Sequence, residues 1–394
     1  MVGATVACAL GLAGVRVAVV ESRPPEPPVD ADAPFALRVS AFSVASQRIL
    51  TRLGVWQRID PTRRGPFRAM RVWDEHGEVR FDGADLGVPA LGHIVENARV
   101  QAALESRLAE LDTVRWYRPA EVESLTLEPD VAVVGLGDAR VRAALLVGAD
   151  GGDSRVRTMA GIAAPGASHG QRAVVATLAT ARPHDETARQ RFLPDGPLAL
   201  LPLPGQRVSI VWSTTPEHAE CLLAETAAGF ATAVEAAAQG CLGAMALEGG
   251  RGAFPLRRLH ASRYVGERVA LVGDAAHTIH PLAGQGVNLG LLDAAVLAEV
   301  VGDVIARGRD PGRVHNLRPY ERRRRPHDAL MGLAMRGFDA LFRARPAPIR
   351  VARGLGLDLT NRLPPLGRAF MRLAAGLDGD LPELARGPRL PELG

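Results

Sequence analysis

The residues best placed to do chemistry lie in one stretch of the second half of the chain. An apolar run from Arg268 to Val272 predicts a buried strand, with Asp274 at its carboxyl end. Glycines follow, and they let backbone N–H groups approach a ligand before a helix that we expect to begin near Gly286. A carboxylate there can accept hydrogen bonds from sugar hydroxyls, and a helix N-terminus suits the electron-rich pyrimidine edge of a reduced flavin. The alternative is an ordinary strand, turn and helix whose glycines serve packing.

A second stretch shows the same order of elements. The apolar residues 145–147 predict a strand, Asp150 and Gly151 follow it, and Ser154 or Asp153 is the expected N-cap of a helix. Taken alone, this pattern is equally consistent with a capped turn that precedes surface arginines. Beside the Asp274 stretch, it favours a second turn at the same ligand.

The first residues predict part of a dinucleotide site. We expect a helix over Ala4–Leu12 and a strand over Val15–Val20 that ends in Glu21. A dinucleotide-binding unit has a strand, a G-x-G-x-x-G turn, a helix, and a second strand whose terminal acid holds the ribose. Gly3 matches the last glycine of that turn, and we expect upstream in-frame codons to encode the first strand and two further glycines. An ordinary α/β beginning is the alternative.

Together these stretches resemble the FAD-dependent aromatic hydroxylases of class A, and within them the branch that hydroxylates polyprenyl phenols in ubiquinone biosynthesis. The residues from Asp274 to Gly290 are specific for the flavin superfamily, while Arg38–Ala41 and Ile94–Asn97 narrow the resemblance to the branch. Further similar stretches are Ser46–Leu50, Leu53–Trp56, Asn361–Pro365 and Ala374–Leu377. One departure is Ala98, where the family usually carries an arginine that helps to hold the cofactor; Arg99 or Gln101 is the expected substitute.

The resemblance implies an α/β fold. It has a Rossmann-like FAD-binding domain of the p-hydroxybenzoate-hydroxylase type, an inserted β-sheet substrate domain and a C-terminal helical region. The expected ranges are 1–64, 93–163 and 262–330 for the FAD-binding domain, 65–92 and 164–261 for the substrate domain, and 331–394 for the helical region.

Inside the substrate domain, strands are predicted over Arg172–Ala181, Pro197–Leu203 and Arg207–Ser213 of one sheet. Val208, Ile210 and Trp212 alternate onto one face of that sheet. The helical region is expected to begin near Met331 and to break at Pro346, Pro348 and Pro364-Pro365.

The resemblance also implies which residues hold FAD. Glu21 and Arg38 are expected at the adenosine and pyrophosphate half, Asp150 and Gly151 near the pyrophosphate, and Asp274 on the ribityl side. The other expected cofactor contacts are Gly3, Gly284, Gln285, Gly286 and Asn288.

In this class NAD(P)H reduces FAD, O2 adds to the flavin as a C4a-hydroperoxide, and its distal oxygen is delivered to an electron-rich ring carbon. The protein places the ring and excludes water, with Pro281 expected beside the flavin near the substrate. Phenolates react more readily, yet a phenol has a pKa of about 10, so His277 and His280 are candidate bases by position. Their spacing would also suit a metal pair, but no third ligand is spaced with them, and no metal is expected. Hydrogen bonding to nearby backbone is the commoner role.

Composition excludes several kinds of chemistry. All 47 basic residues are arginine, which removes Schiff-base lysines and a P-loop lysine. Three cysteines, Cys8, Cys221 and Cys241, are too few and too far apart for a zinc site or a disulfide framework, so a reduced, cytosolic setting is expected. No apolar run reaches the ~20 residues of a membrane span.

The net charge of +4 hides an arginine-rich region. From Arg307 to Arg372 there are sixteen arginines against five acids, a local balance of +11. We expect peripheral contact with the anionic inner face of the plasma membrane, where a polyprenyl phenol resides, and possible membership of a ubiquinone-biosynthesis complex. A solvated helical face is the alternative. Nucleic acid is not an expected partner, because few aromatic residues interleave with the arginines.

Three other functions share parts of this pattern. A flavin-dependent halogenase would carry a W-x-W-x-I-P motif, which is absent, since Trp212 stands in Val-Trp-Ser. A polyprenyl reductase shares the fold but not the branch-specific stretches. A flavin-free scaffold subunit of a biosynthetic complex is the alternative from a different class.

Overall fold

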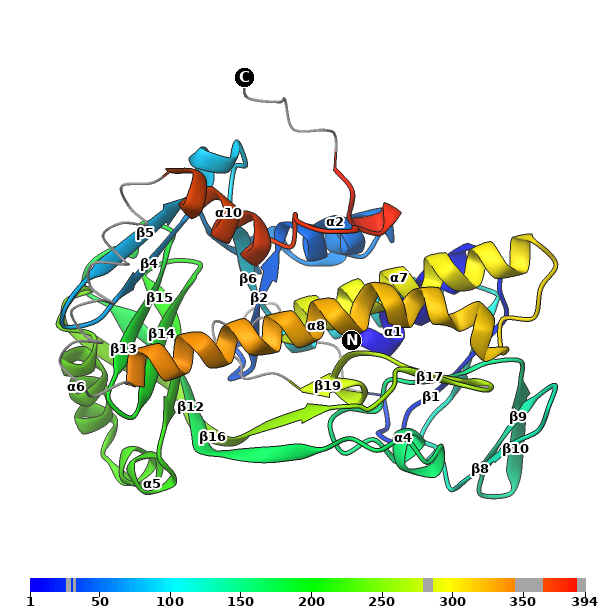
Figure 1. The fold of residues 1–394 in the computed structure, drawn as a ribbon. Coiled ribbons are helices and arrows are strands. Elements are labelled where there is room, and N and C mark those ends of the chain that lie inside the picture. The colour runs from blue at the N-terminus through cyan, green and yellow to red at the C-terminus, as the bar shows by residue number, and fades with distance from the viewer. Residues whose placement is uncertain (26–29, 31–32, 279–285, 344–363, 388–394) are drawn as a thin grey trace.

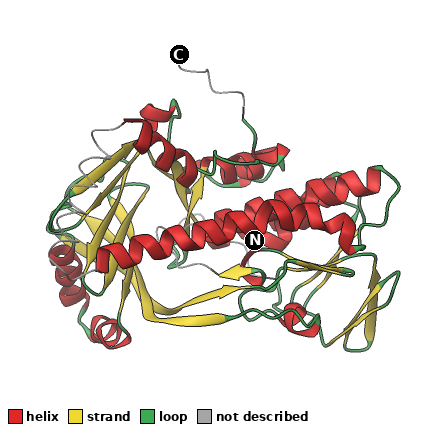
Figure 2. Ribbon diagram, in the orientation of Figure 1, coloured by secondary structure: helices red, strands yellow, loops and turns green. Residues whose placement is uncertain are grey.

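The computed structural model shows a mixed α/β fold and describes residues 1–25, 30, 33–278, 286–343 and 364–387 (Figures 1 and 2). The α-helices are α1 (Val2–Leu12), α2 (Val44–Arg52), α3 (Asn97–Leu108), α4 (Arg155–Met159), α5 (Pro216–Ala224), α6 (Ala227–Ala237), α7 (Gly286–Ala306), α8 (Val314–Arg343) and α10 (Pro364–Ala374). Short 3₁₀ helices are η1 (Trp56–Arg58), η2 (Pro61–Arg63), η3 (Gly83–Leu86), η4 (Gly273–Ala275) and η6 (Glu383–Ala385).

The strands up to the middle of the chain are β1 (Val17–Val20), β2 (Val39–Ser43), β3 (Gly65–Phe67), β4 (Ala69–Trp73), β5 (Glu78–Asp82), β6 (Gly92–Glu96), β7 (Val114–Tyr117), β8 (Ser124–Leu127), β9 (Ala132–Leu136), β10 (Ala139–Ala143) and β11 (Leu146–Gly148). The later strands are β12 (Gly166–Thr180), β13 (Thr187–Leu193), β14 (Gly196–Leu203), β15 (Arg207–Thr214), β16 (Met245–His260), β17 (Val265–Gly266), β18 (Val269–Leu271) and β19 (His277–Thr278).

Two parallel strand pairs carry the turns that the sequence singles out. β1 pairs with β7, and β11 pairs with β18, which β17 extends on its other edge. The carboxyl ends of parallel strands meet at one edge of a sheet, where ligands of α/β folds usually bind. Glu21 therefore lies beside the segment after Tyr117, and Asp150 and Asp274 follow neighbouring strands.

Helix α1 is apolar around its circumference because it is buried on two sides. Ala7 and Cys8 pack in a core with residues of α2, α3 and α7. Val6 and Leu10 pack in a second core with residues of β18, α7 and α8. Packing against both cores fixes the position and orientation of the N-terminal turn of α1.

The large antiparallel sheet has the order β19-β16-β12-β15-β14-β13-β4-β5. It confirms the three strands predicted for the substrate part, and Val208, Ile210 and Trp212 are buried together in one core with residues of α5 and α6. The long strands β12 and β16 extend from the sheet toward the other half of the molecule (Figure 1). There β16 pairs with β19, which follows Asp274 closely in sequence.

Helix α8 differs from the prediction. It begins at Val314 rather than near Met331 and contains Pro319 and Pro326. A stripe of buried side chains, among them Leu317 and Tyr320, explains this because its packing outweighs the local effect of the prolines. Figure 1 shows α8 running across the front of the molecule.

The predicted break at Pro364-Pro365 coincides with the first residues of α10, a position that proline favours. Met371 of α10 and the following Leu377 pack on Leu86 and Leu91. Pro346 and Pro348 lie outside the described residues.

The predicted domain boundaries can be set beside the sheets. Strands β4 and β5 join the large sheet of β12–β16, as an inserted substrate domain requires. Strand β3, which the predicted boundary at residue 65 assigns to the same part, pairs with β6 in a separate sheet with β2. The division into domains stays a prediction.

A buried arginine anchors the start of β18. The Arg268 side chain is fully buried and donates to Asp310 and to the carbonyl oxygens of Pro129 and Ala144. These partners come from the segment after β8, the segment before β11 and the α7–α8 connection. The clamp fixes the strand that leads into Asp274.

Candidate functional site

Three predicted stretches meet at the first turn of α1. A Cβ built on Gly3 would lie 3.0 Å from the Ala149 Cβ, so the glycine permits the helix to approach the turn that carries Asp150. A Cβ on Gly290 would lie 2.6 Å from the Val2 Cγ2. The N-terminus of α1 thus packs against α7 and lies beside the turns that carry Asp150 and Asp274, which we call the two aspartate turns. This is a suitable place for an anion.

Asp274 lies in η4, directly after the buried strand β18. Gly273 has a φ of +58°, which favours glycine and turns the chain sharply at this point. The Asp274 side chain is exposed to solvent, and no hydrogen bond from the described residues reaches its carboxylate. Crowding by protein atoms raises the pKa of this carboxyl, while the charges of His277 and Arg38 oppose the shift. A carboxylate at a strand end that accepts no hydrogen bond from the described residues suits a ligand contact.

Asp150 forms hydrogen bonds within its own turn, and its expected place near the pyrophosphate stays a prediction. Its carboxylate accepts hydrogen bonds from the Ser154 hydroxyl and, at 3.0 Å, from the Val156 N–H, so it helps to cap α4. Ser154 is the N-cap, as predicted, and accepts from the Arg157 N–H at 2.9 Å. Asp150 therefore shapes the turn that presents Gly151.

Arg157 joins the two aspartate turns. The sequence interpretation missed this role, because it counted Arg157 among the surface arginines. It is buried and donates to the Ala275 carbonyl oxygen at 2.9 Å and to that of Gly152 at 2.8 Å. Because it bonds both turns, it keeps them at a fixed separation.

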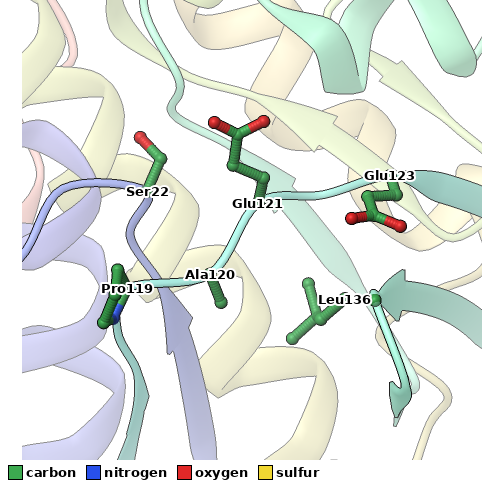
Figure 3. Close-up of a pocket in the computed structure, with 7 residues that line it drawn as sticks. Ser22, Pro119, Ala120, Glu121, Glu123 and Leu136 are labelled. Atoms are coloured by element: carbon green, nitrogen blue, oxygen red, sulfur yellow. The ribbon is translucent and has the colours of Figure 1, made fainter.

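A cavity of about 330 Å³ opens at the carboxyl ends of β1 and β7 (Figure 3). Its lining residues are Ser22, Pro119, Ala120, Glu121, Glu123, Leu136 and Gly137. Glu21 immediately precedes Ser22, which lines the cavity. The Glu21 carboxylate accepts a hydrogen bond from the Arg23 N–H at 3.1 Å. The sequence predicted Glu21 here but not the residues after β7.

Arg99 lies in a buried ion cluster. It donates to Glu96 at 2.7 Å, and Arg63 donates to the same carboxylate at 2.9 Å. Arg99 also donates to the Asp30 carbonyl oxygen at 2.7 Å, so the cluster includes the Asp30 backbone. In this arrangement Arg99 organises the protein, and its expected role as the substitute for the family arginine stays a prediction.

Two other expected cofactor contacts lie apart from that cluster. The Gln101 amide donates to Glu105 at 2.7 Å, and Glu105 forms an ion pair with Arg118. Arg38 is exposed, and its guanidinium lies 5.3 Å from the Phe254 ring centroid. Arg38 is therefore free to reach a ligand near Asp274.

The start of α7 is partly described. Gly286 begins the helix, and a Cβ built on it would meet no atom of the described residues within 4 Å, so these leave its backbone open on that side. The Asn288 amide accepts from the Ser43 N–H at 2.9 Å and donates to the Ala41 carbonyl oxygen at 2.7 Å. Asn288 thus ties α7 to β2. The other predicted residues of this stretch, His280, Pro281, Gly284 and Gln285, lie outside the described residues.

His277 belongs to a buried charge network. Its Nε2 lies 2.6 Å from Asp293 Oδ2 and 3.3 Å from Asp328 Oδ2. Arg324 donates to Asp293 at 2.6 Å and to Asp328 at 2.7 Å. Burial alone would lower the pKa of His277, but Asp328 and Asp293 outweigh it and raise the pKa to about 9. A histidine that keeps its proton is a poor general base, and the expected catalytic role of His277 stays a prediction.

The same network bears on metal binding. Among the described residues, the ligand atoms of His277, Asp293 and Asp328 lie within 4.8 Å of one another, a spacing that a metal ion also uses. Arg324 already supplies positive charge to both carboxylates. The carboxylates are therefore paired with cationic side chains of the protein and form a closed ion network.

The sequence interpretation missed Asp293, Arg324 and Asp328. Two signals were present: Asp293 interrupts the apolar run of α7, and Arg324 and Asp328 are spaced i, i+4 on one helix. An acid in an apolar helix implies a buried partner, although its identity depends on the fold.

One prediction concerns the pH dependence of stability. The native state holds a proton on His277 up to about pH 9, whereas the unfolded chain loses it near pH 6.5. The stabilising contribution is therefore complete below pH 6.5 and is lost as the pH rises through about 9. We expect the difference in unfolding free energy between the wild type and His277→Gln to shrink by about 1.4 kcal/mol per pH unit across this window. Urea unfolding at fixed salt measures it, and a difference independent of pH would contradict the assignment.

Comparisons with known proteins agree with this geometry. The FAD binding domain family, FAD_binding_3, matches residues 1–331. The chain is 39% identical over 393 residues to ubiquinone hydroxylase UbiL of Rhodospirillum rubrum, covering 98% of this chain and 91% of that protein. It is 37% identical over 379 residues to 3-demethoxyubiquinol 3-hydroxylase of Escherichia coli, covering 96% of each.

Among solved structures, p-nitrophenol 4-monooxygenase PnpA from Pseudomonas putida is similar, with a TM-score of 0.75 and 20% identity. The match covers 99% of this chain and 96% of that one, and it concerns the fold. The predicted fold class and family resemblance are both confirmed. The chain belongs to the FAD-dependent monooxygenase family that includes the ubiquinone-biosynthesis hydroxylases.

Proposed function

We propose that this protein is an FAD-dependent, NAD(P)H-consuming monooxygenase that hydroxylates the aromatic ring of a polyprenyl phenol in ubiquinone biosynthesis. The observation that carries the proposal is the meeting of α1 with the two aspartate turns, in a chain 37–39% identical to the two ubiquinone-related hydroxylases over nearly its whole length. Assembly with other enzymes of the same biosynthesis stays a prediction.

The described residues fit an extended dinucleotide. The cavity beside Glu21 is large enough for an adenosine, and the N-terminus of α1 at Gly3 suits a diphosphate. The Asp274 carboxylate suits the ribityl hydroxyls, and the open Gly286 backbone suits the flavin ring. When bound, FAD supplies the redox chemistry, taking electrons from NAD(P)H and activating O2.

The protein itself contributes position and charge. Asp150 and Arg157 hold the turn of Gly151 in place beside α1, and Arg38 adds an exposed positive charge near Asp274. These groups orient the cofactor rather than react. The roles of Pro281 and His280 at the ring stay predictions.

The Asp274 assignment predicts a selective loss of cofactor. Asp274→Ala should weaken FAD binding by about 10- to 100-fold, because a charge-assisted hydrogen bond contributes ~1.5–3 kcal/mol. Asp195→Ala is the matched control, since Asp195 is an exposed acid in the turn between β13 and β14. Flavin fluorescence titration measures both. Equal affinity in the two variants would remove Asp274 from the site.

The proposed activity predicts a stoichiometric reaction. The FAD-loaded protein, given a short-chain prenyl phenol and NADH or NADPH, should consume reductant and O2 and release a ring-hydroxylated product. Mass spectrometry of the product checks this, and Asp274→Ala without FAD is the control. Reductant oxidation that no phenol stimulates, with no product gaining oxygen, would reject the proposal.

The surface of α8 supports membrane contact. Several arginines of the basic region are already paired, as Arg313 is with Asp130 and Arg323 is with Glu299. Within the described residues, Arg318, Arg322 and Arg325 are exposed without an ion pair, and they share one face of the helix. Leu330 and Leu333 follow and are each 57% exposed. No helix among the described residues is long and apolar enough to cross a membrane.

This surface, the α8 stripe of Arg318, Arg322, Arg325 and Leu333, matches an anionic bilayer in charge and polarity. Each arginine near such a leaflet contributes ~1 kcal/mol, and the attraction is screened within ~10 Å at 0.1 M salt. A substrate that partitions into lipid would be met there.

Vesicle co-sedimentation tests the stripe. The wild type should bind anionic vesicles more than neutral ones and release them as salt rises. Replacing the three stripe arginines by glutamine should abolish the difference. The control variant replaces Arg16, Arg140 and Arg182, which are exposed elsewhere, by glutamine. It changes the net charge equally and should keep the preference for anionic vesicles. Equal binding of the two triple variants, or no lipid binding by the wild type, would contradict membrane docking through α8.

A further inference from the structure

One carboxylate oxygen closes the turn that carries Asp274. Asp293 Oδ2 accepts the Gly273 N–H at 3.0 Å and lies 2.6 Å from His277 Nε2. These two donors stand one residue before and three residues after Asp274. Both ends of the turn are therefore fastened to the same atom of α7.

The orientation of Asp293 depends on α8. Arg324 Nε donates to the other oxygen, Asp293 Oδ1, at 2.6 Å, and its Nη2 donates to Asp328 at 2.7 Å. Arg324 thereby leaves Oδ2 of Asp293 facing the turn. Tyr264 stacks on His277 with ring centroids 5.7 Å apart and donates to Asp328 at 3.3 Å, which closes the network on its remaining side.

The charges balance within a volume that excludes water. Two carboxylates face Arg324 and protonated His277, and the side chains are at most 6% exposed. Breaking one pair would leave an uncompensated buried charge, so the network has one strongly preferred arrangement. The network therefore fixes the turn that carries Asp274 through its bonds to the Gly273 N–H and to His277.

We propose that Asp293 is a positioning residue whose Oδ2 holds the turn from Gly273 to His277 and so aims the Asp274 carboxylate at the flavin, with Arg324 orienting Asp293. This inference rests on the proposed contact of Asp274 with FAD. It assigns a cofactor-binding effect to a side chain that does not itself reach the cofactor.

Asp328 provides a matched control. It is an acid of the same network, also buried and also bonded to Arg324, but it does not bond the Gly273 N–H. Asp293→Asn and Asp328→Asn remove the same charge from the same place. Positioning through the turn predicts weaker FAD binding for Asp293→Asn alone, by about 10-fold, whereas a purely structural role predicts similar behaviour of both.

The test is a double-mutant cycle on FAD affinity with Asp274→Ala. Asp293→Asn should weaken binding about 10-fold in the wild type and have an effect within about twofold in the Asp274→Ala background, because its effect passes through Asp274. Should Asp293→Asn fail to fold, Arg324→Lys replaces it in the cycle, since it keeps the charge but cannot bridge both acids. The absorbance spectrum of bound FAD should shift in the same variants.

Each result has one meaning. An equal fold-change in both backgrounds, or no change in the wild-type background, overturns the positioning role while leaving Asp274 in the site. Unchanged FAD binding by Asp274→Ala itself would instead reject the proposed cofactor contact on which the inference rests.

Discussion

Asp293 is an acid without access to solvent, and its charge has to be matched inside the protein. Removing a carboxylate from water costs several kcal/mol, and only close partners offset that cost. Here the partners are Arg324 of α8 and His277, which ends the turn that carries Asp274. Meeting this requirement brings α7, α8 and the end of β18 to one point. The relative placement of the candidate site and the longest helix follows from it.

Small residues supply the second constraint. The first turn of α1 can approach the two aspartate turns only because Gly3, Gly273 and Gly290 carry no side chain. Arg157 then joins the turns to each other, while Arg268 fixes the strand that leads into Asp274. The large sheet reaches the same place through β16 and β19. A substrate held on that sheet would therefore be brought to the end of the cofactor site that carries Asp274.

Much of the fold could be predicted because its signals are local. Alternating apolar residues predicted β15, and Ser154 predicted the cap of α4. The strand ends at Glu21 and Asp274 could be located because each follows a short apolar strand. Side-chain partners could not be found, since they depend on contacts between distant segments: His277 meets Asp328 only through the packing of α8.

One incorrect expectation has that origin. Helix α8 begins at Val314, rather than near Met331 as expected, because its buried side chains pack on the core. Asn288 and Asp150 carry residue types that suit a ligand, yet nearby backbone groups use their side chains. Position along the chain thus predicted which turns lie close together better than it predicted the hydrogen-bond partners of their side chains.

The central claim is that the cavity beside Glu21 and the turn that carries Asp274 hold the two ends of one FAD molecule. Determining the structure of the protein with FAD bound tests this most directly. The account predicts the adenosine in the cavity between Ser22 and Pro119, the diphosphate at the N-terminus of α1, and the Asp274 carboxylate within hydrogen-bonding distance of the ribityl chain. An FAD that leaves the cavity empty, or that lies out of reach of Asp274, would contradict it.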